Sequence, residues 1–132
     1  MIAVTQRKKV LVIDNDNDIL DVINEALTYE GFSVTGFVEA DNIFPIITNV
    51  EPDIVILDYL LNGINGGEIC HQIKTTAITA QLPVIIISAY PKVINSLGNY
   101  YCNAFIAKPF DLEQIINCIN SLIQANQPSH LC

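Results

Sequence analysis

Four short apolar runs in this sequence end in polar side chains of types that handle phosphoryl groups. The runs cover residues 10–13, 54–57, 84–87 and 105–107, and the polar residues that follow them are Asp14, Asp58, Ser88 and Lys108. If folding brings these four together, Asp58 could act as a nucleophile and form an aspartyl phosphate. Ser88 and Lys108 would then offer a hydroxyl and a positive charge to the phosphoryl oxygens, because phosphoryl transfer depends mainly on positioning and charge neutralisation.

Oxygen ligands for a divalent cation gather after two of these runs. Asp14 and Asp58 supply carboxylates, and Asn15 supplies an amide oxygen beside Asp14. Such donors suit a hard cation such as Mg²⁺, which usually keeps several waters and shares its remaining positions with a phosphate. Asp16 and Asp18 are better explained as residues that cap the beginning of a helix. The candidate metal ligands are therefore Asp14, Asn15 and Asp58.

Strand and helix patterns alternate along the chain around these residues. Strands are predicted at residues 10–13, 33–37, 54–57, 84–87 and 105–107, and helices at 18–30, 42–49, 66–74 and 112–123. Units of this kind in series favour an α/β fold with a parallel sheet and helices on both faces. Right-handed crossovers place the carboxyl ends of all strands on one edge, where ligands of open sheets bind. The polar residues named above all fall on that edge.

Glycine, proline and aspartate positions predict where several helices begin and end. Gly31 should close the first predicted helix, because glycine readily adopts the backbone conformation of a C-terminal cap. Pro45 lies inside the second predicted helix and lacks an N–H donor, so that helix should begin late or bend. Asp111 should cap the last helix. Between the last two strands, Pro91 and Gly98 restrict any helix to about two turns.

The composition favours one folded domain and argues against nucleic-acid binding. The chain has 132 residues, of which 51% are hydrophobic, so it is near the common size of a single domain and can bury a full core. The formal net charge is −8, from 14 acidic and 6 basic residues. Three of the bases are adjacent at residues 7–9, so no basic face remains to neutralise a phosphate backbone.

Neither the cysteines nor the apolar runs indicate secretion or a membrane. Cys70, Cys102, Cys118 and Cys132 form no C-x-x-C pair, so we expect buried thiols rather than metal ligands or disulfides. The bases at residues 7–9 precede only four apolar residues, which excludes a secretory signal. No apolar run approaches the roughly 18 residues needed to cross a bilayer. The expected compartment is a reducing cytoplasm.

Several motifs in combination resemble the receiver domain of two-component response regulators. They lie at residues 10–14, 56–63, 86–89 and 107–110, with Gly66 and Glu68 following the second. The likeness covers roughly residues 8–124. It implies a single receiver domain over residues 1–132, with a polar C-terminal tail at 125–132. It also implies a flavodoxin-like, doubly wound sheet of five parallel strands in the order 2-1-3-4-5.

The resemblance assigns a phosphoacceptor and a metal site to the predicted edge. Asp58 would accept the phosphoryl group, and Asp14 and Asn15 would occupy the acid-pair positions that bind Mg²⁺. Leu60 would offer its backbone carbonyl to the same ion. Mg²⁺ is therefore the expected cofactor.

A second group of residues would respond to the phosphate. By the same resemblance, Ser88 and Lys108 would contact the phosphoryl oxygens. Phe105 would be the aromatic switch partner that turns inward as Ser88 moves toward the phosphate. The family also implies a cis peptide bond between Lys108 and Pro109, which would fix the direction of the lysine.

Asn15 is a departure from the family pattern that bears on the metal. The family usually has a second acid at this position, whereas an amide brings no charge, so we expect weaker Mg²⁺ binding. Removing one carboxylate from a repulsive cluster should also lessen the upward pressure on the pKa values of the remaining acids.

The implied function is a phosphorylation-dependent signalling switch rather than an enzyme. A sensor histidine kinase or a phosphotransfer protein of a phosphorelay would donate to Asp58. The last strand and its flanking helices, within residues 90–124, would then change their binding to a downstream protein partner. Uptake from small phosphate donors and self-dephosphorylation would occur at the same site. No output domain follows Gln124, so we expect either a protein that acts through partners or a receiver excised from a longer chain.

Two other functions stay open from the sequence. Asn15 motivates a receiver-like interaction module that no longer depends on phosphate. The D-x-D sequence that begins at Asp14 also resembles the start of haloacid-dehalogenase-type phosphatases, in which the first Asp attacks the phosphate. Those enzymes need a later acidic pair, and the two acids near the end of the chain, Asp111 and Glu113, are better explained by helix capping. Phosphate on Asp58 would indicate a receiver, and phosphate on Asp14 a phosphatase.

Overall fold

The chain forms a parallel sheet with helices on both faces. The computed structural model describes residues 7–90, 92 and 101–125. The sheet has five parallel strands in the order β2-β1-β3-β4-β5, which confirms the predicted fold. The strands are β1 (Lys9–Ile13), β2 (Ser33–Phe37), β3 (Ile54–Asp58), β4 (Val84–Ser88) and β5 (Ala104–Ala107). The helices are α1 (Asn17–Tyr29), α2 (Ile43–Val50), α3 (Gly66–Lys74) and α5 (Leu112–Ala125).

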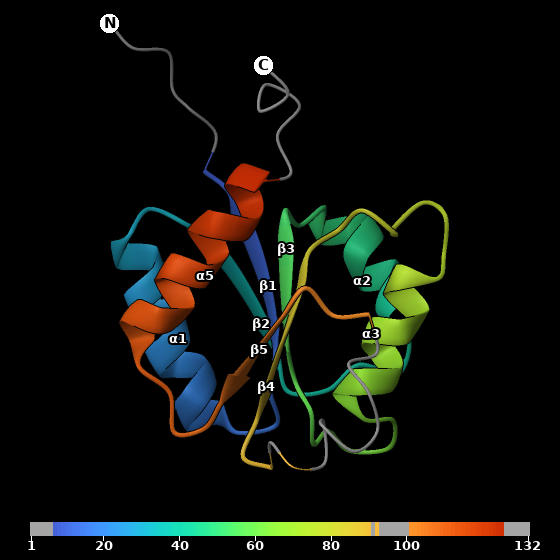
Figure 1. Cartoon of the computed structure of the whole chain (residues 1–132), viewed down its shortest axis with the longest axis horizontal. Helices are drawn as coiled ribbons and strands as arrows, with labels where there is room; N and C mark the ends of the chain where they lie inside the picture. The colour runs from blue at the N-terminus through green and yellow to red at the C-terminus, as the bar shows by residue number, and fades with distance from the viewer. Residues whose placement is uncertain (1–6, 91, 93–100, 126–132) are drawn as a thin grey trace, which may run out of the picture.

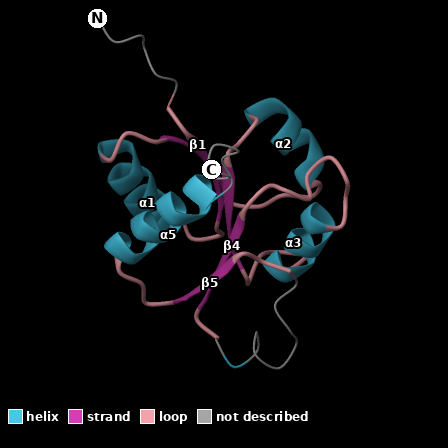
Figure 2. Ribbon diagram, turned by 45° about the horizontal axis from the view of Figure 1, so that its top comes forward, coloured by secondary structure: helices cyan, strands magenta, loops and turns pink. Residues whose placement is uncertain are grey.

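The helices divide the core into two layers. Figures 1 and 2 show α1 and α5 on one side of the sheet and α2 and α3 on the other. Alternate residues of β1 serve the two layers, with Leu11 and Ile13 in the α2/α3 cluster and Val10 and Val12 in the α1/α5 cluster. Every residue of β3 and β4 is buried, as expected for parallel strands covered on both faces. The polar residues that end these strands, Asp58 in β3 and Ser88 in β4, are therefore buried as well.

The ends of α1 agree with the capping signals. Asp16 precedes the helix, and its side chain accepts a hydrogen bond from the Asp18 N–H at 2.9 Å. Gly31 follows the helix with a φ of 98°, a left-handed conformation that suits glycine, and its N–H donates to the Thr28 carbonyl at 3.0 Å. The sequence-based interpretation of Asp16 as a cap and Gly31 as a terminator is confirmed.

The sequence predicted that α2 would begin late or bend, and the late start is wrong. The helix begins at Ile43, and Asn42 caps it by accepting from the Phe44 N–H at 3.1 Å. Pro45 consequently lies in the first turn, where the N–H groups have no intrahelical acceptor, so the missing donor removes no helical hydrogen bond. The helix ends at Val50, and Glu51 follows in the left-handed region with a φ of 53°.

Other predictions about individual segments have mixed outcomes. Asp111 caps α5 by accepting from the Glu113 N–H at 3.0 Å. Of the three cysteines within the described residues, Cys70 is buried as expected, Cys102 and Cys118 are half-buried, and none of the three forms a disulfide. The short helix expected near Pro91 and Gly98, and most of the expected polar tail, lie outside the described residues. None of the helices in the described part of the chain is long and apolar enough to cross a membrane.

Candidate functional site

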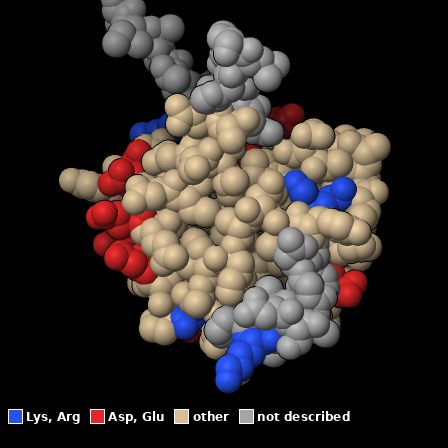
Figure 3. All heavy atoms as spheres, in the orientation of Figure 1, with Lys and Arg blue, Asp and Glu red and all other residues tan. Residues whose placement is uncertain are grey.

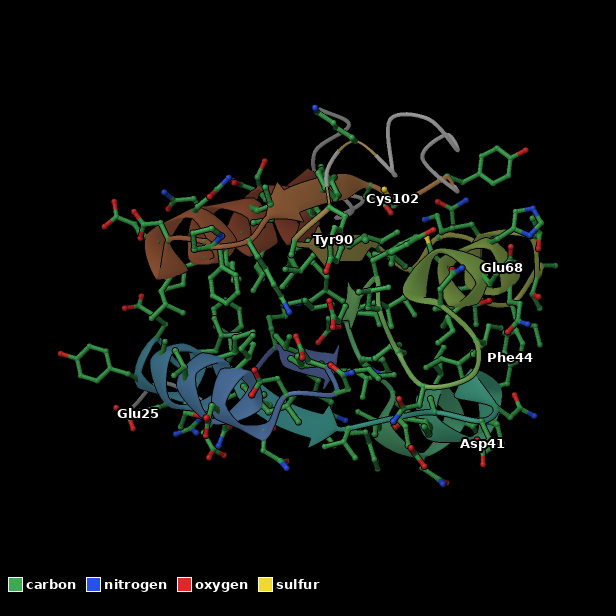
Figure 4. All side chains as sticks on the ribbon, turned by 90° about the horizontal axis from the view of Figure 1, so that it is seen from below. Glu25, Asp41, Phe44, Glu68, Tyr90 and Cys102 are labelled. Carbon is green, nitrogen blue, oxygen red and sulfur yellow. The ribbon has the colours of Figure 1, made fainter. Side chains whose placement is uncertain are left out.

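The predicted polar residues meet at the carboxyl edge of the sheet. Asp58 is the last residue of β3 and pairs with Ile87 of β4, while Ser88 ends β4 and pairs with Ala107. Asp14 follows β1 directly, and its N–H donates to the Phe37 carbonyl at 3.1 Å. Asp14, Asp58 and Ser88 are only 1%, 5% and 1% exposed. Figure 4 views the molecule from this edge, which opens between the two helical layers.

Lys108 joins the two buried carboxylates. Its Nζ lies 3.2 Å from Asp14 Oδ2 and 3.3 Å from Asp58 Oδ1. The Lys108 N–H donates to the Ser88 carbonyl at 2.8 Å, so the residue continues the pairing of β5 with β4. The peptide bond that follows, between Lys108 and Pro109, is cis, as the family resemblance implied. One ammonium therefore neutralises part of the charge of two acids that come from distant parts of the chain.

The pKa of Asp58 depends on the burial of this residue and on its charged neighbours. Desolvation by burial raises the pKa of Asp58 most, and repulsion by Asp14 raises it further. The Lys108 charge, its hydrogen bond and the backbone N–H of Leu60 act in the opposite direction. The net result is a raised pKa, so the folded protein holds a carboxylate whose ionised form is costly. Such a group gains from any further cation or electrophile that reaches it.

Asp14 is oriented through both of its carboxylate oxygens. The Asp16 N–H donates to Asp14 Oδ1 at 2.9 Å, and Asp14 Oδ2 faces Lys108. The turn from β1 into α1 thus aims Asp14 at the same ammonium that contacts Asp58. This geometry forms because residues 14–16 leave the strand and cap the helix within one turn.

Ser88 and Phe105 are placed at the edge but have different surroundings. The Ser88 hydroxyl accepts a hydrogen bond from the Tyr90 N–H at 2.8 Å. Figure 4, which views the carboxyl edge of the sheet, shows Tyr90 between the two helical layers. Phe105 pairs with Ile86 and is half-buried against the α2/α3 cluster. The switching roles of Ser88 and Phe105 stay predictions.

The remaining candidate metal donors are exposed. Asn15 and Leu60 directly flank the site in sequence, and both are exposed, Leu60 by 49%. Within the described residues, no three His, Cys, Asp or Glu side chains form a group able to hold a metal ion. Mg²⁺ commonly binds through only one or two carboxylates together with waters and phosphate, however. The two acids, one amide and one backbone carbonyl therefore fit a Mg²⁺ site of low charge.

Sequence reasoning named Gly66 only as part of a motif and missed how Gly66 and Tyr90 shape the site. Gly66 begins α3, and its N–H donates to the Tyr59 carbonyl at 2.8 Å. A Cβ at this position would overlap the Asp58 carbonyl group, so the helix can approach β3 only with glycine there. The sequence did contain a signal for Gly66. Glycine forms helices less well than alanine, so a glycine at the beginning of a helix indicates that a larger residue would not fit there. The bond from the Tyr90 backbone had no signal, because every residue except proline carries an N–H.

Curated proteins with similar sequences include response regulators. The profile of the response regulator receiver domain matches residues 10–120. The response regulator MprA of Mycobacterium sp. (strain KMS) is 26% identical over 122 residues, which are 91% of this chain and 52% of that protein. The DNA-binding dual master transcriptional regulator RpaA of Synechocystis sp. is 25% identical over 118 residues, or 88% of this chain and 49% of that protein. The chain thus spans about half the length of these curated relatives.

Solved structures agree with the fold. A CheY-like response regulator receiver domain protein from Methanospirillum hungatei JF-1 superposes with a TM-score of 0.80 at 22% identity, covering 92% of this chain and 97% of that one. Full-length FixJ from B. japonicum gives a TM-score of 0.80 at 25% identity, covering 96% of this chain and 62% of that one. The family profile matches residues 10–120 and the strand order is the one that the resemblance implied, so the chain belongs to the receiver domain family of two-component response regulators.

Proposed function

We propose that this chain is a phosphorylation-dependent switch in which Asp58 accepts the phosphoryl group. The observation that supports this most directly is the contact of one ammonium with two buried carboxylates, at 3.2 and 3.3 Å from Lys108 Nζ. Asp58 is costly to ionise, lies at the end of a strand and faces a positive charge that can also hold phosphoryl oxygens. These features support Asp58 as the nucleophile and Lys108 as the group that would balance the charge of the phosphoryl oxygens.

The transfer itself needs little further chemistry. A carboxylate oxygen of Asp58 attacks the phosphorus atom in line with the bond to the donor, and a new P–O bond forms. The bond from phosphorus to the donor nitrogen or oxygen breaks, and its electron pair leaves with the donor. Lys108 stays close to the product, where its charge balances the phosphoryl oxygens.

A divalent cation would assist at the same edge. Asp14, Asn15, Asp58 and the Leu60 carbonyl would hold Mg²⁺, which supplies positive charge to the phosphoryl oxygens. The Lys108 ammonium already contacts both carboxylates, and Asn15 adds no charge of its own. We therefore expect the affinity for Mg²⁺ to be lower than in a site with three carboxylates.

The phosphate would be sensed through β4 and β5. To reach a phosphoryl oxygen, the Ser88 hydroxyl would leave the Tyr90 N–H that it accepts from at 2.8 Å. Movement of Ser88 would free space for Phe105, which lies on the neighbouring strand and is half-buried. The surface within residues 90–124, which includes β5 and α5, would then change its affinity for a downstream protein.

The proposed partners are proteins of a two-component pathway. A sensor histidine kinase or phosphotransfer protein would donate to Asp58, and a downstream protein would bind the surface within residues 90–124. RpaA is described as DNA-binding, but this chain has 6 basic residues against 14 acidic ones, so we propose no direct contact with nucleic acid.

Backbone NMR with a phosphate mimic tests the proposal. Addition of Mg²⁺ with beryllofluoride or acetyl phosphate should shift the amide signals of Ser88, Phe105 and Lys108. Asp58→Asn should abolish these shifts, and Asp16→Asn, which keeps the helix cap, should preserve them. Unchanged spectra of the natural protein at millimolar Mg²⁺ would instead favour the phosphate-independent interaction module that Asn15 suggested.

The position of the phosphate separates a receiver from a phosphatase. Reduction of the aspartyl phosphate with borohydride, followed by mass spectrometry, should place the label on Asp58. Label on Asp14 would favour the phosphatase alternative. The structure gives that alternative no added support, since Asp111 is engaged in capping α5 through the Glu113 N–H.

A further inference from the structure

Two neighbouring segments without charged residues lie on the α2/α3 side of the sheet. Residues 42–50, which contain α2, and residues 75–83, which connect α3 to β4, include no acidic or basic side chain. The two segments are distant in sequence but line one pocket together. In a chain with a net charge of −8, this gap in the surface charge needs an explanation.

The pocket between these segments is apolar. It has a volume of about 570 Å³ and is lined mainly by Phe44, Ile47, Thr48, Thr76, Ile78 and Leu82. The Thr48 and Thr76 hydroxyls donate to the carbonyls four residues earlier in the chain, at 2.9 and 2.7 Å. Their polar groups are thus satisfied internally. Among the described lining residues, Glu51 alone carries a charge.

Ile78 stands beside this pocket and is almost fully in water. Its exposed fraction is 94%, the highest among the large hydrophobic residues in the described part of the chain. A single exposed isoleucine is ordinary, but one at the rim of an apolar pocket gives the same surface both a protruding group and a recess. A surface of that shape can be complementary to itself.

We infer that this surface binds a second copy of the chain. In a two-fold symmetric pair, Ile78 of each copy would enter the pocket of the other, since such an interface uses the same patch twice. Charge selects the occupant. Figure 3 shows acidic side chains gathered over α1, and two such faces would repel, whereas the only charged residue in the lining of this pocket, among the described residues, is Glu51.

The position of the pocket makes the pair independent of phosphate chemistry. Glu51 and Pro52 precede β3, and Leu82 precedes β4, so the pocket lies at the amino edge of the sheet. Asp58 and Ser88 lie at the carboxyl edge. The inference therefore does not rest on the proposed switch, and the two can fail separately.

Sedimentation velocity of the full chain over a range of concentrations tests the inference. With rising concentration, up to about 1 mM for a weak contact, the mass should move from 14.6 kDa toward twice that value. Ile78→Asp should weaken the dimer about 100-fold or more, because a symmetric pair loses two buried isoleucines. Thr48→Glu, which alters the recess rather than the protrusion, should also abolish it.

Tyr29→Asp is the matched control. Tyr29 is 88% exposed on α1, and the substitution adds the same charge to the opposite side of the sheet, so the dimer should persist. Added salt should strengthen the pair by screening the repulsion between two chains of charge −8. A single-chain mass at every concentration, or equal loss with Tyr29→Asp and Ile78→Asp, would overturn the inference.

Discussion

Asp58 is 5% exposed and lies beside a second buried carboxylate, so its ionised form carries a free-energy cost in the folded protein. Lys108 offsets part of that cost through its contact at 3.3 Å. Burial nevertheless raises the pKa of Asp58 above its value in the unfolded chain. Asp58 therefore destabilises the folded state at neutral pH. The proposed role of Asp58 as phosphoacceptor explains why a residue with this cost is present.

Asp58→Asn should consequently stabilise the protein at neutral pH. The amide needs no ionisation, so the free energy of unfolding should rise by roughly 1 kcal/mol, the usual scale of single-residue effects. The gain should be fully present above the raised pKa of Asp58. It should shrink as the pH falls through that pKa, because the natural carboxyl group then takes up a proton in the folded protein. Urea unfolding over a pH series measures this effect.

The exposed Asp16→Asn variant provides the comparison for Asp58→Asn. Asp16 caps α1 through the Asp18 N–H, and asparagine caps equally well, so little change in stability is expected. If Asp58→Asn were less stable than the natural protein at neutral pH, the contact with Lys108 would outweigh the cost of burial.

Asn15→Asp should tighten the binding of Mg²⁺. The substitution adds a carboxylate beside Asp14, where the present donors are two acids, an amide and a backbone carbonyl. We expect an increase in affinity of about tenfold, the lower range for changes around a metal. Calorimetric titration of the phosphate-free protein measures it directly. Unchanged affinity would mean that position 15 does not contribute to the site.

Single residues also show what the sequence could and could not predict. Asp14, Asp58 and Lys108 were found because each follows an apolar run, and parallel strands bring such positions to one edge. The bridging of both acids by one ammonium depends on side-chain directions across the chain, which no local pattern contains. The hydrogen bond between the Tyr90 N–H and the Ser88 hydroxyl was not predicted either, because no local sequence pattern indicates it.

At the scale of elements, the position of a residue within a helix mattered more than its type. Pro45 suggested a late or bent α2, yet the helix begins at Ile43 because Asn42 supplies the cap. Proline is tolerated in a first turn, and the sequence pattern alone did not place that turn accurately. Strong caps such as Asp16 and Gly31 gave the ends of α1 to within one residue.

The junction between β3 and α3 yields a prediction of this kind. Gly66→Ala adds a methyl group that would overlap the Asp58 carbonyl, so α3 must shift away from the strand. We expect a loss of about 1–3 kcal/mol in the free energy of unfolding, as for an overpacked core. Without the overlap, alanine in a helix would instead stabilise by roughly 0.5–1 kcal/mol. The sign of the change in the free energy of unfolding, measured with urea, therefore shows whether the methyl group overlaps the Asp58 carbonyl.

Gly63→Asn serves as the control for Gly66→Ala. Gly63 has a φ of 85°, which asparagine tolerates better than most residues, and a Cβ there meets nothing within 4 Å. The strain of a side chain at this φ should cost less stability than the overlap created by Gly66→Ala. A loss as large as that of Gly66→Ala would point to the loop as a whole rather than to the contact with Asp58.

At the scale of the molecule, the sheet was predictable and its surface was not. Continuous apolar runs such as β3 and β4 indicate burial on both faces, and their alternation with helices leaves few possible topologies. The apolar pocket combines residues 44–52 with residues 76–82. No sequence pattern predicts that these two uncharged segments are neighbours, because their contact depends on the packing of α2 beside α3.

The two edges of the sheet should act independently. Asp58 lies at the carboxyl edge and the pocket at the amino edge, about 13 Å away along a five-residue strand. Beryllofluoride with Mg²⁺ should change the dissociation constant of the pair by less than the roughly fivefold seen for weak allosteric coupling. Ile78→Asp should in turn leave the NMR response of Ser88 and Lys108 intact. A larger change in either measurement would mean that β3 and β4, which run from one edge to the other, transmit the phosphorylation state to the association of two chains.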